Sequence, residues 1–396
     1  MSGRSRPRIA VVGGAGAMGR ITIRDLAETA PAGIDLVLAD RDVATARKVA
    51  AMLPRRVKVV AADASSPDAL ARALEGVGII INACHHSLNL AVMDTALMLG
   101  AHYCDLGGLF HVTKRQLRRH AEFKRAGLLA LCGIGSAPGI VNVMARAGVD
   151  RFDRVDEIHI AVGTVDRTPR VGTPLLDVSY SLLTVLDEAS RPAALFTGGR
   201  LRFVPPLSHE AVVDFPPPVG RQRPACTLHS ELATLPASFK GKGVREVSFR
   251  IAFPGDLIER LRFTHALGLT STTPVRINGT RVVPRDVLLA LVAAAGKPVA
   301  TGPRDEHEIL RVVVEGVRGA RRVVETQDCH VPGMPAWGIG VDIDTGAPPS
   351  IAAQMIASGA ITARGVVAPE RAMPPAPFFD ELARRGMRIT RRLHRK

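Results

Sequence analysis

The chain has 396 residues, of which 46% are hydrophobic and 4% aromatic, and its formal net charge is +15. This length exceeds one ordinary hydrophobic core, so we expect two domains. Because aromatic side chains are scarce, a stacking platform for single-stranded nucleic acid is not expected, and we predict no nucleic-acid partner. No run of about 18 apolar residues is present, so we predict no membrane span.

The cysteines and the two ends of the chain bear on its compartment. The five cysteines form no Cys-x-x-Cys pair, which is typical of a reduced cytoplasmic protein without a structural metal. The first eight residues are polar and basic and lead directly into a strand, so we predict no signal peptide. The basic segment 384–396 is either a solvated terminus or a tail that binds an anion or nucleic acid.

The first predicted strand stops at a glycine cluster, after which a helix is expected over 18–28. Gly14, Gly16 and Gly19 have the G-x-G-x-x-G spacing of a dinucleotide-binding turn. The first glycine permits the tight turn, the second lets the backbone approach a pyrophosphate, and the third lets the helix pack on the strand. The helix start at Ala17 and Met18 then offers unpaired N–H groups to the phosphates.

The second predicted strand, 35–39, ends at an acidic residue, Asp40, at the distance from the turn that the fingerprint requires. A carboxylate there accepts hydrogen bonds from the adenosine ribose and favours NAD. Arg41 follows directly and could instead pair with the 2′-phosphate of NADP. Asp63, after the third strand, is either an adenine contact or a cap of the next helix.

Strand and helix signals alternate up to residue 132 and predict an α/β fold, a doubly wound parallel Rossmann sheet. The remaining expected elements of this part are strands over 57–61, 78–83, 102–105 and 128–131 and helices over 43–52, 67–74, 89–99 and 113–126. In such sheets the ligand binds beyond the carboxyl ends of the strands.

Polar residues follow the fourth and fifth strands at that edge. Asn82 and Ala83 end the fourth strand, near the nicotinamide half of the cofactor, and His85 and His86 come next. Adjacent histidines point in different directions, so they are poor joint metal ligands. Either one of them contacts the substrate or the cofactor, or they are structural. Asp105 ends the fifth strand and is a candidate to remove a proton during oxidation, or else a loop cap.

The sequence pattern changes after residue 138. Alternating strands and a hairpin signal at Asn278–Gly279 predict a second, α+β domain on a mixed or antiparallel sheet. Helices are expected over 175–188, 285–295, 350–358 and 378–385, and strands over 244–253, 308–315 and 320–326. Within 227–236, His229 and Glu231 would share one face of an extended segment, where such a pair can bind an ammonium group or move a proton.

Together these segments resemble the saccharopine dehydrogenase-like oxidoreductases, most closely the lysine 6-dehydrogenase group. The segments that carry the resemblance are 13–19, 39–41, 102–107, 136–142, 215–220, 227–236, 352–356 and 365–370. The resemblance implies a Rossmann domain over 1–138, a substrate and dimerisation domain over 139–345, and C-terminal helices over 346–396 that return to the first domain. It therefore also implies a homodimer.

The resemblance further implies a hydride transfer at a C–N bond of an amino acid, with NAD or NADP. By it, Gly107, Pro138 and Asn142 would border the cofactor and the substrate, and His229, Glu231 and Thr234 would line the substrate pocket. We therefore expect oxidative deamination of a lysine-like amino acid, with Asp105 or His229 as the base. The alternatives are a saccharopine-type reductase that joins an aldehyde to an amino acid, and a non-catalytic NAD(P)-binding sensor.

Overall fold

The computed structural model describes residues 7–395 except 173–175, 177 and 179, and it divides into two compact units. The first unit comprises Met1–Arg151, Ala233–Gly241 and Ile343–Arg385. The second comprises Phe152–Leu232, Lys242–Asp342 and Gly386–Lys396. In the part of the chain that the structure describes, no helix is long and apolar enough to cross a membrane.

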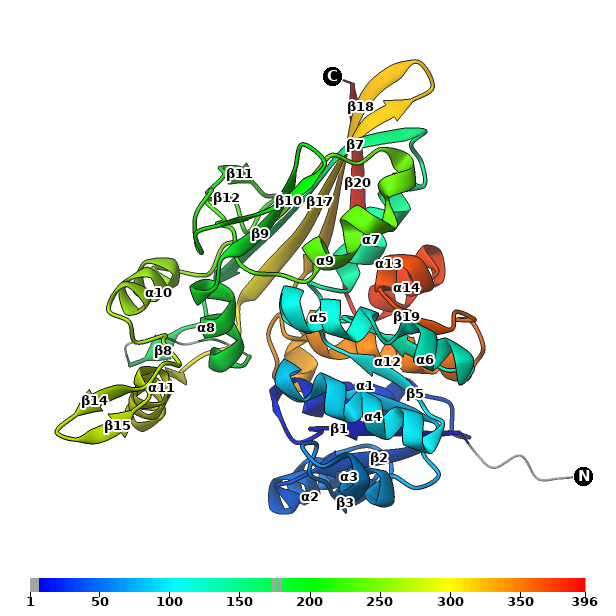
Figure 1. Ribbon diagram of the computed structural model, residues 1–396, viewed down its shortest axis with the longest axis vertical. Coiled ribbons are helices and arrows are strands. Elements are labelled where there is room, and N and C mark those ends of the chain that lie inside the picture. The colour runs from blue at the N-terminus through cyan, green and yellow to red at the C-terminus, as the bar shows by residue number, and fades with distance from the viewer. Residues whose placement is uncertain (1–6, 173–175, 177, 179, 396) are drawn as a thin grey trace, which may run out of the picture. The chain divides into compact units, whose positions relative to one another are not determined.

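The first unit is built on a seven-stranded parallel sheet with the order β19-β6-β5-β4-β1-β2-β3, which confirms the predicted Rossmann architecture (Figure 1). Its central strands are buried on both faces, which is why they read as continuous apolar runs. The strands are β1 (Arg8–Val12), β2 (Asp35–Asp40), β3 (Lys58–Ala61), β4 (Ile79–Asn82), β5 (His102–Asp105), β6 (Leu129–Leu131) and β19 (Gly365–Val367). The C-terminal strand β19 was not predicted.

The helices of the first unit fall between these strands and in the returning C-terminal segment. They are α1 (Ala17–Thr29), α2 (Val43–Ala51), α3 (Pro67–Ala73), η1 (His86–Leu88), α4 (Asn89–Leu99), α5 (Leu109–Leu117), α6 (His120–Arg125), α7 (Ile140–Val149), α12 (Ile343–Ala357), α13 (Pro369–Ala372) and α14 (Pro375–Arg384). The single helix predicted over 113–126 is therefore two helices. Between them, Arg119 pairs with Asp94 on α4 and Glu122 on α6.

The C-terminal helices are attached to α1 by close packing and a buried ion pair. Gly346 on α12 lies so near Ile21 that a Cβ there would come within 2.5 Å of its side chain. Arg385 donates to both carboxylate oxygens of Asp25, at 2.6 and 2.8 Å, and Ser350 donates to the same carboxylate at 2.5 Å. Because such a pair is costly to break when buried, this contact fixes the returning segment in the first unit.

The second unit is built on a mixed seven-stranded sheet with the order β10-β9-β13-β7-β17-β18-β20, in which only β13 and β7 pair in parallel. The strands of this sheet are β7 (Arg154–Asp166), β9 (Ala193–Thr197), β10 (Arg200–Val204), β13 (Glu246–Ile251), β17 (Glu306–Arg318), β18 (Arg321–Val331) and β20 (Arg388–Arg395). The two-stranded sheets are β8 (Arg170–Val171) with β16 (Val299–Ala300), β11 (Val213–Asp214) with β12 (Arg221–Gln222), and β14 (Val275–Ile277) with β15 (Thr280–Val282).

Three longer helices belong to the second unit and share one apolar core: α8 (Leu182–Ser190), α10 (Leu257–Ala266) and α11 (Pro284–Ala295). The helix predicted over 175–188 is α8, and part of that range lies outside the described residues. The remaining short helices are α9 (Glu231–Ser238), η2 (Lys240–Lys242) and η3 (Pro335–Trp337).

The bounds of the two units differ from the expected domain bounds. The first unit continues beyond residue 138 through α7 and also takes in 233–241, so Thr234 lies in it. The expectation that 346–396 returns as helices is wrong for the last residues, because β20 pairs with β18 in the sheet of the second unit. In β20 the two apolar residues, Ile389 and Leu393, are four positions apart and so lie on the same face of the strand, a pattern that the many basic residues of the tail hide.

Candidate functional site

The glycine turn between β1 and α1 has the geometry of a dinucleotide cradle. A Cβ on Gly19 would lie 2.1 Å from the carbonyl oxygen of Gly13, so only glycine lets α1 pack against the turn. A Cβ on Gly16 would meet that oxygen at 3.2 Å and no other atom of the protein within 4 Å. Gly16 caps α1 without a side-chain hydrogen bond, so the first N–H groups of the helix, those of Ala17 and Met18 among them, can bind phosphate.

The turn lies between the ends of β2 and β4. A Cβ on Gly14 would come within 2.7 Å of Leu38, and one on Gly13 within 2.8 Å of Cys84 Sγ. The same Cβ on Gly13 would lie 3.2 Å from the main-chain carbonyl of Ala83. The structure thus brings together the glycines and the end of β4, as the predicted fold requires.

The acidic residues after β2 and β3 have different surroundings. Asp40 accepts hydrogen bonds from the main-chain N–H of Ala15, at 3.0 Å, and of Asp42, at 2.9 Å, so it fixes the turn to the end of β2. Arg41 is exposed beside it. Asp63 accepts from the main chain and the hydroxyl of Ser65, and these bonds lower its pKa. Asp63 therefore stabilises the turn after β3, and the N-cap residue of α3 is Ser66.

Asp105 lies at the end of β5, is 1% exposed, and accepts five hydrogen bonds. The donors are Tyr103 Oη at 2.8 Å, Gln116 Nε2 at 2.6 Å, Asn89 Nδ2 at 3.2 Å and the main-chain N–H groups of Gly107 at 2.9 Å and Gly133 at 2.7 Å. Asn82, predicted at the cofactor, donates to Asn89 and to Tyr103 within the same network. Burial raises the pKa of Asp105, and these hydrogen bonds oppose the rise.

These five hydrogen bonds favour a structural role for Asp105 over that of a base, because its carboxylate oxygens already accept from donors in four different segments of the chain. We expect Asp105→Asn to lower the free energy of unfolding by about 1–3 kcal/mol, since an amide N–H would then face another donor. Urea unfolding followed by circular dichroism measures this. Asp380→Asn, an exposed position on α14, is the control and should leave stability unchanged. Normal stability with a large loss of turnover would instead make Asp105 catalytic.

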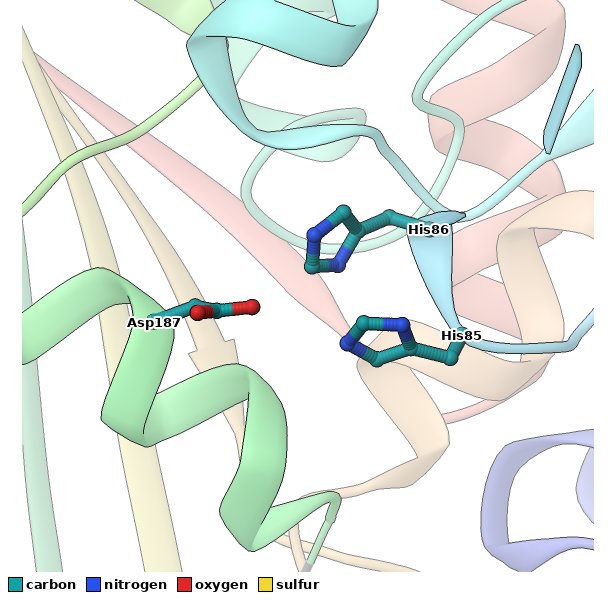
Figure 2. Close-up of side chains that lie close together, drawn as sticks. All are labelled: His85, His86 and Asp187. Carbon is teal, nitrogen blue, oxygen red and sulfur yellow. The ribbon is translucent and has the colours of Figure 1, made fainter. Parts of the chain in front are cut away.

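His85 and His86 precede α4, with their ring centroids 3.9 Å apart and the planes tilted by 45° (Figure 2). His85 Nδ1 lies 2.9 Å from Ser87 Oγ and caps the turn η1. The third labelled side chain, Asp187, belongs to α8 of the second unit, where it pairs with Arg285 and Arg191. The two histidines therefore lie beside the end of β4, next to the glycine turn in the sheet.

The turn before α7 belongs to a second buried network of the first unit. Pro138 packs against Gly133, where a Cβ would meet its ring at 2.8 Å. Asn142 accepts from the N–H of Gly139 and donates to Glu370 Oε2 at 2.9 Å and to Thr234 Oγ1 at 3.4 Å. Burial raises the pKa of Glu370, which also accepts from Ser238. Asn142 and Thr234 thus attach the turn to α9 and α13.

The second unit holds a buried cluster of ionisable groups around His229. His229 Nδ1 lies 3.3 Å from Glu231 Oε2, and its Nε2 lies 3.6 Å from Glu188 Oε2 on α8. The imidazole stacks on Phe249 of β13, with centroids 3.7 Å apart and planes within 15°. All three ionisable side chains are at most 7% exposed. Because the N–H of Leu228 donates to the carbonyl of Glu188, the segment is fixed to α8.

The charge of this cluster follows from its composition. Burial alone would lower the pKa of His229, but the carboxylates of Glu231 and Glu188 outweigh it and raise the pKa to about 10. At neutral pH the ring is therefore an imidazolium, and the cluster has a net charge of −1. A ring that keeps its proton in this way favours stabilisation of charge over the role of base that the sequence predicted for His229.

One hydroxyl group is hydrogen-bonded to this cluster, and two buried hydroxyl groups belong to the same segment of chain as His229. Tyr180 donates to Glu188 Oε2 at 3.3 Å, and burial raises its own pKa well above the usual value, so it stays protonated. The side-chain oxygens of Thr227 and Ser230 are buried and have no hydrogen-bond partner among the described residues. Buried hydroxyls without partners are rare in folded proteins, and a polar ligand group would satisfy them.

The raised pKa of His229 predicts a pH dependence of stability. An unfolded histidine titrates near 6.5 and the folded one near 10, so its contribution is complete below pH 6.5 and is lost as the pH rises to about 10. The shift corresponds to on the order of 5 kcal/mol. Urea unfolding between these pH values should show wild type losing stability more steeply than His229→Gln. His159→Gln, at a half-exposed position, is the control. If wild type and His229→Gln lose stability equally as the pH rises, the prediction is wrong.

Several residues of these networks were missed by sequence reasoning. Glu188 and Tyr180 lie far from His229 in the chain, and Asn89, Gln116 and Glu370 reach their partners only through the fold. No local spacing connects them. The one signal in the sequence was a polar side chain inside an otherwise apolar helical segment, as for Asn89 at the start of α4.

Two family models match the chain. The model described as the saccharopine dehydrogenase NADP binding domain matches residues 9–131, and that of the saccharopine dehydrogenase C-terminal domain matches residues 135–387. Together they span the glycine turn, both networks of the first unit and the His229 cluster.

Curated relatives and solved structures are similar along nearly the whole chain. A carboxyaminopropylagmatine dehydrogenase of Synechocystis sp. is 24% identical over 364 residues, covering 89% of this chain and 90% of that protein. A carboxynorspermidine synthase of Vibrio alginolyticus is 21% identical and covers 94% of each chain. The saccharopine dehydrogenase (L-Glu forming) of Saccharomyces cerevisiae has a TM-score of 0.74 at 15% identity, over 98% of this chain and 100% of that chain. The homospermidine synthase of Legionella pneumophila, in complex with NAD, has a TM-score of 0.66 at 12% identity, over 99% of this chain and 92% of that chain. At these identities the structural likeness shows the fold alone.

Proposed function

The chain belongs to the saccharopine dehydrogenase family of NAD(P)-dependent oxidoreductases, and we propose that it reduces an imine to a secondary amine. The imine would form between an aldehyde that carries an α-amino acid group and one nitrogen of a diamine or of a guanidino amine such as agmatine. The names of the curated relatives, a carboxynorspermidine synthase and a carboxyaminopropylagmatine dehydrogenase, support this substrate class. They favour the reductase alternative over oxidative deamination of a lysine-like amino acid, the reaction of the lysine 6-dehydrogenase group.

The observation that carries the proposal is the net negative charge buried around His229. An imine accepts a hydride readily only as the iminium cation, and the free ends of diamines are ammonium groups. The carboxylates of Glu188 and Glu231 outnumber the one imidazolium between them, so the cluster stabilises an added positive charge. The buried hydroxyls of Thr227 and Ser230, which come from the same segment as His229, would be available as hydrogen-bond acceptors for N–H groups of the substrate.

The overall reaction balances as a condensation followed by a reduction. The primary amine adds to the aldehyde carbon and water leaves, which forms the C=N bond. When bound, the cofactor supplies the hydride to that carbon, and the product is a secondary amine with NAD(P)⁺. The attacking amine must first lose the proton of its ammonium form, and the imine nitrogen then takes up one proton to become the iminium. The residues of the second unit would stabilise that iminium until the hydride is transferred, and the glycine turn and the N-terminus of α1 would bind the pyrophosphate.

We also propose NAD as the preferred cofactor, because the Asp40 carboxylate at the end of β2 would oppose a 2′-phosphate. We expect NADH to bind at least about tenfold more tightly than NADPH, a difference of about 1.4 kcal/mol. Fluorescence titration measures the dissociation constants of NADH and NADPH. Asp40→Ala should bring these two constants closer together, and Arg41→Ala should leave NADH the more tightly bound cofactor. Tighter binding of NADPH by the wild type would contradict the preference.

The reaction is tested by following the absorbance of NADH and NADPH with aspartate β-semialdehyde and a primary amine, 1,3-diaminopropane or agmatine. Oxidation of the reduced cofactor only when aldehyde and amine are both present supports the proposal, with the secondary amine identified by mass spectrometry. Reduction of NAD⁺ by lysine alone would instead support oxidative deamination. Cofactor binding without turnover in either assay would support the sensor.

A further inference from the structure

A pocket of about 750 Å³ lies where the first three strands of the Rossmann sheet begin. Its lining includes Arg8, Asp35 and Lys58, which are the first residues of β1, β2 and β3, the blue strands in Figure 1. Asp40, beside the glycine turn, is the last residue of β2. The pocket and the glycine turn therefore lie at opposite edges of the same sheet. We term this pocket the amino-end pocket; the loops before β2 and β3 complete its lining with residues that include Ile34, Arg55 and Arg56.

The charged side chains of the amino-end pocket are mostly basic. Arg8 lies opposite Asp35, and Lys58 lies opposite Val37, so Arg8, Asp35 and Lys58 project from one face of the sheet. Like charges gathered in one cavity repel one another, and a bound anion would remove this unfavourable energy. Asp35 is the one acidic residue of the lining, which therefore has a net charge of +3 at neutral pH from four basic residues, Arg8, Arg55, Arg56 and Lys58.

Two of these cations are unpaired, and a third is held in place. In the part of the chain that the structure describes, the side chains of Arg56 and Lys58 are exposed and form no hydrogen bond or ion pair. Arg55 Nη1 donates to the carbonyl of Ala30, the C-cap of α1, at 3.0 Å, and its Nη2 donates to the carbonyl of Ile34 at 2.7 Å. The pocket thus has one anchored guanidinium and two cations that can move to meet a ligand.

The inner lining of the amino-end pocket is apolar. Ile34, Leu36, Val37 and Val57 belong to it, and each is at most 8% exposed. A cavity of this volume, with apolar walls and a few charged groups, is typical of a small-molecule site. Three of its four cations are arginines, whose planar guanidinium binds phosphate bidentately and stacks on planar rings. An anion that also carries an apolar or planar part fits both features.

We propose that the amino-end pocket binds a small molecule with an oligophosphate group, either a nucleoside triphosphate or a free oligophosphate, while the glycine turn holds the cofactor. A triphosphate carries about three or more negative charges at neutral pH and so matches the charge of the lining. A single carboxylate would leave most of that charge uncompensated. The site is independent of the proposed reaction, because none of its residues belongs to the glycine turn or to the His229 cluster.

The test is isothermal titration calorimetry of the full-length protein, saturated with NADH, with sodium tripolyphosphate and with ATP in the absence of magnesium. We expect one site per chain and binding at least about tenfold weaker in the double variant Arg56→Gln/Lys58→Gln, since it loses two charge-assisted hydrogen bonds to phosphate. Arg47→Gln/Lys48→Gln is the matched control, because it removes two exposed basic residues of α2 that do not line the pocket. The control should bind like the wild type.

NADH titration and circular dichroism show whether each variant is folded, and both variants should keep the NADH affinity of the wild type. ATP that binds more tightly than tripolyphosphate identifies a nucleotide site, and equal affinities identify an oligophosphate site; either result supports the proposal. No binding of either compound up to about 1 mM overturns it, as does an equal effect of the two double variants. Tighter binding of citrate, or of a single-stranded oligonucleotide, would show a site for another class of anion and also overturns it. Failure of the proposed reaction is measured separately by the cofactor assay.

Discussion

Gly16→Val is expected to reduce the affinity for NAD(P) at least about 100-fold, or about 2.7 kcal/mol, while the protein stays folded. The reason is the free space around this residue: a Cβ there meets only the carbonyl oxygen of Gly13, at 3.2 Å. The valine side chain would therefore occupy the space that the pyrophosphate needs rather than displace protein atoms. Fluorescence titration with NADH and thermal unfolding, measured on the same sample, separate the two effects.

Two glycine variants make this prediction sharp. In Gly33→Val the new side chain has no protein atom within 4 Å of its Cβ, so both binding and stability should stay normal. In Gly19→Val the Cβ would lie 2.1 Å from the carbonyl oxygen of Gly13, so binding and stability should fall together. Undiminished NADH binding by Gly16→Val would rule out the turn as the cofactor site.

The cofactor turn was predictable from the sequence because each of its requirements is local. The glycine spacing, the strand before it and Asp40 lie within about 30 residues, and their roles follow from steric and dipole rules. The same reasoning placed Asp105 at the edge of the sheet. It could not find that Asn89 and Gln116 saturate this carboxylate, because helix periodicity does not say which polar side chain turns inward.

The rest of the structure, including the cluster around His229, depends on contacts between residues that are far apart in the sequence. His229 and Glu231 were recognised as a pair, but Glu188, which adds to the effect of Glu231 on the pKa of the histidine, comes from another element. In the same way β19 and β20 join sheets whose other strands lie far away in the sequence. Such pairings depend on the register of the whole sheet, which short apolar runs do not specify.

Glu231→Gln is expected to lower kcat/KM of the proposed condensation by about 100-fold or more, mainly through the amine. The variant has the same shape, so no cavity forms, but the net charge of the Glu188–His229–Glu231 cluster changes from −1 to 0. The positive charge of the iminium then loses its stabilisation, and the pKa of His229 falls because one of its two carboxylates is gone. Steady-state rates with NADH, at varied amine and varied aldehyde, give the two KM values and kcat.

A merely structural role for Glu231 would give a different pattern from an electrostatic one. Breaking a buried pair costs about 3–5 kcal/mol of stability, so rates must be measured well below the melting temperature of the variant. Glu157→Gln is the matched control, since Glu157 pairs with His159 at 2.8 Å in the same unit but at a half-exposed position, and it should leave kcat/KM unchanged. If the charge matters, KM for the amine rises, KM for the aldehyde does not, and the pH dependence of the rate moves to lower pH with the pKa of His229. Equal loss for both substrates with an unchanged pH profile would remove the cluster from the amine site, and the reductive proposal would lose the observation on which it depends.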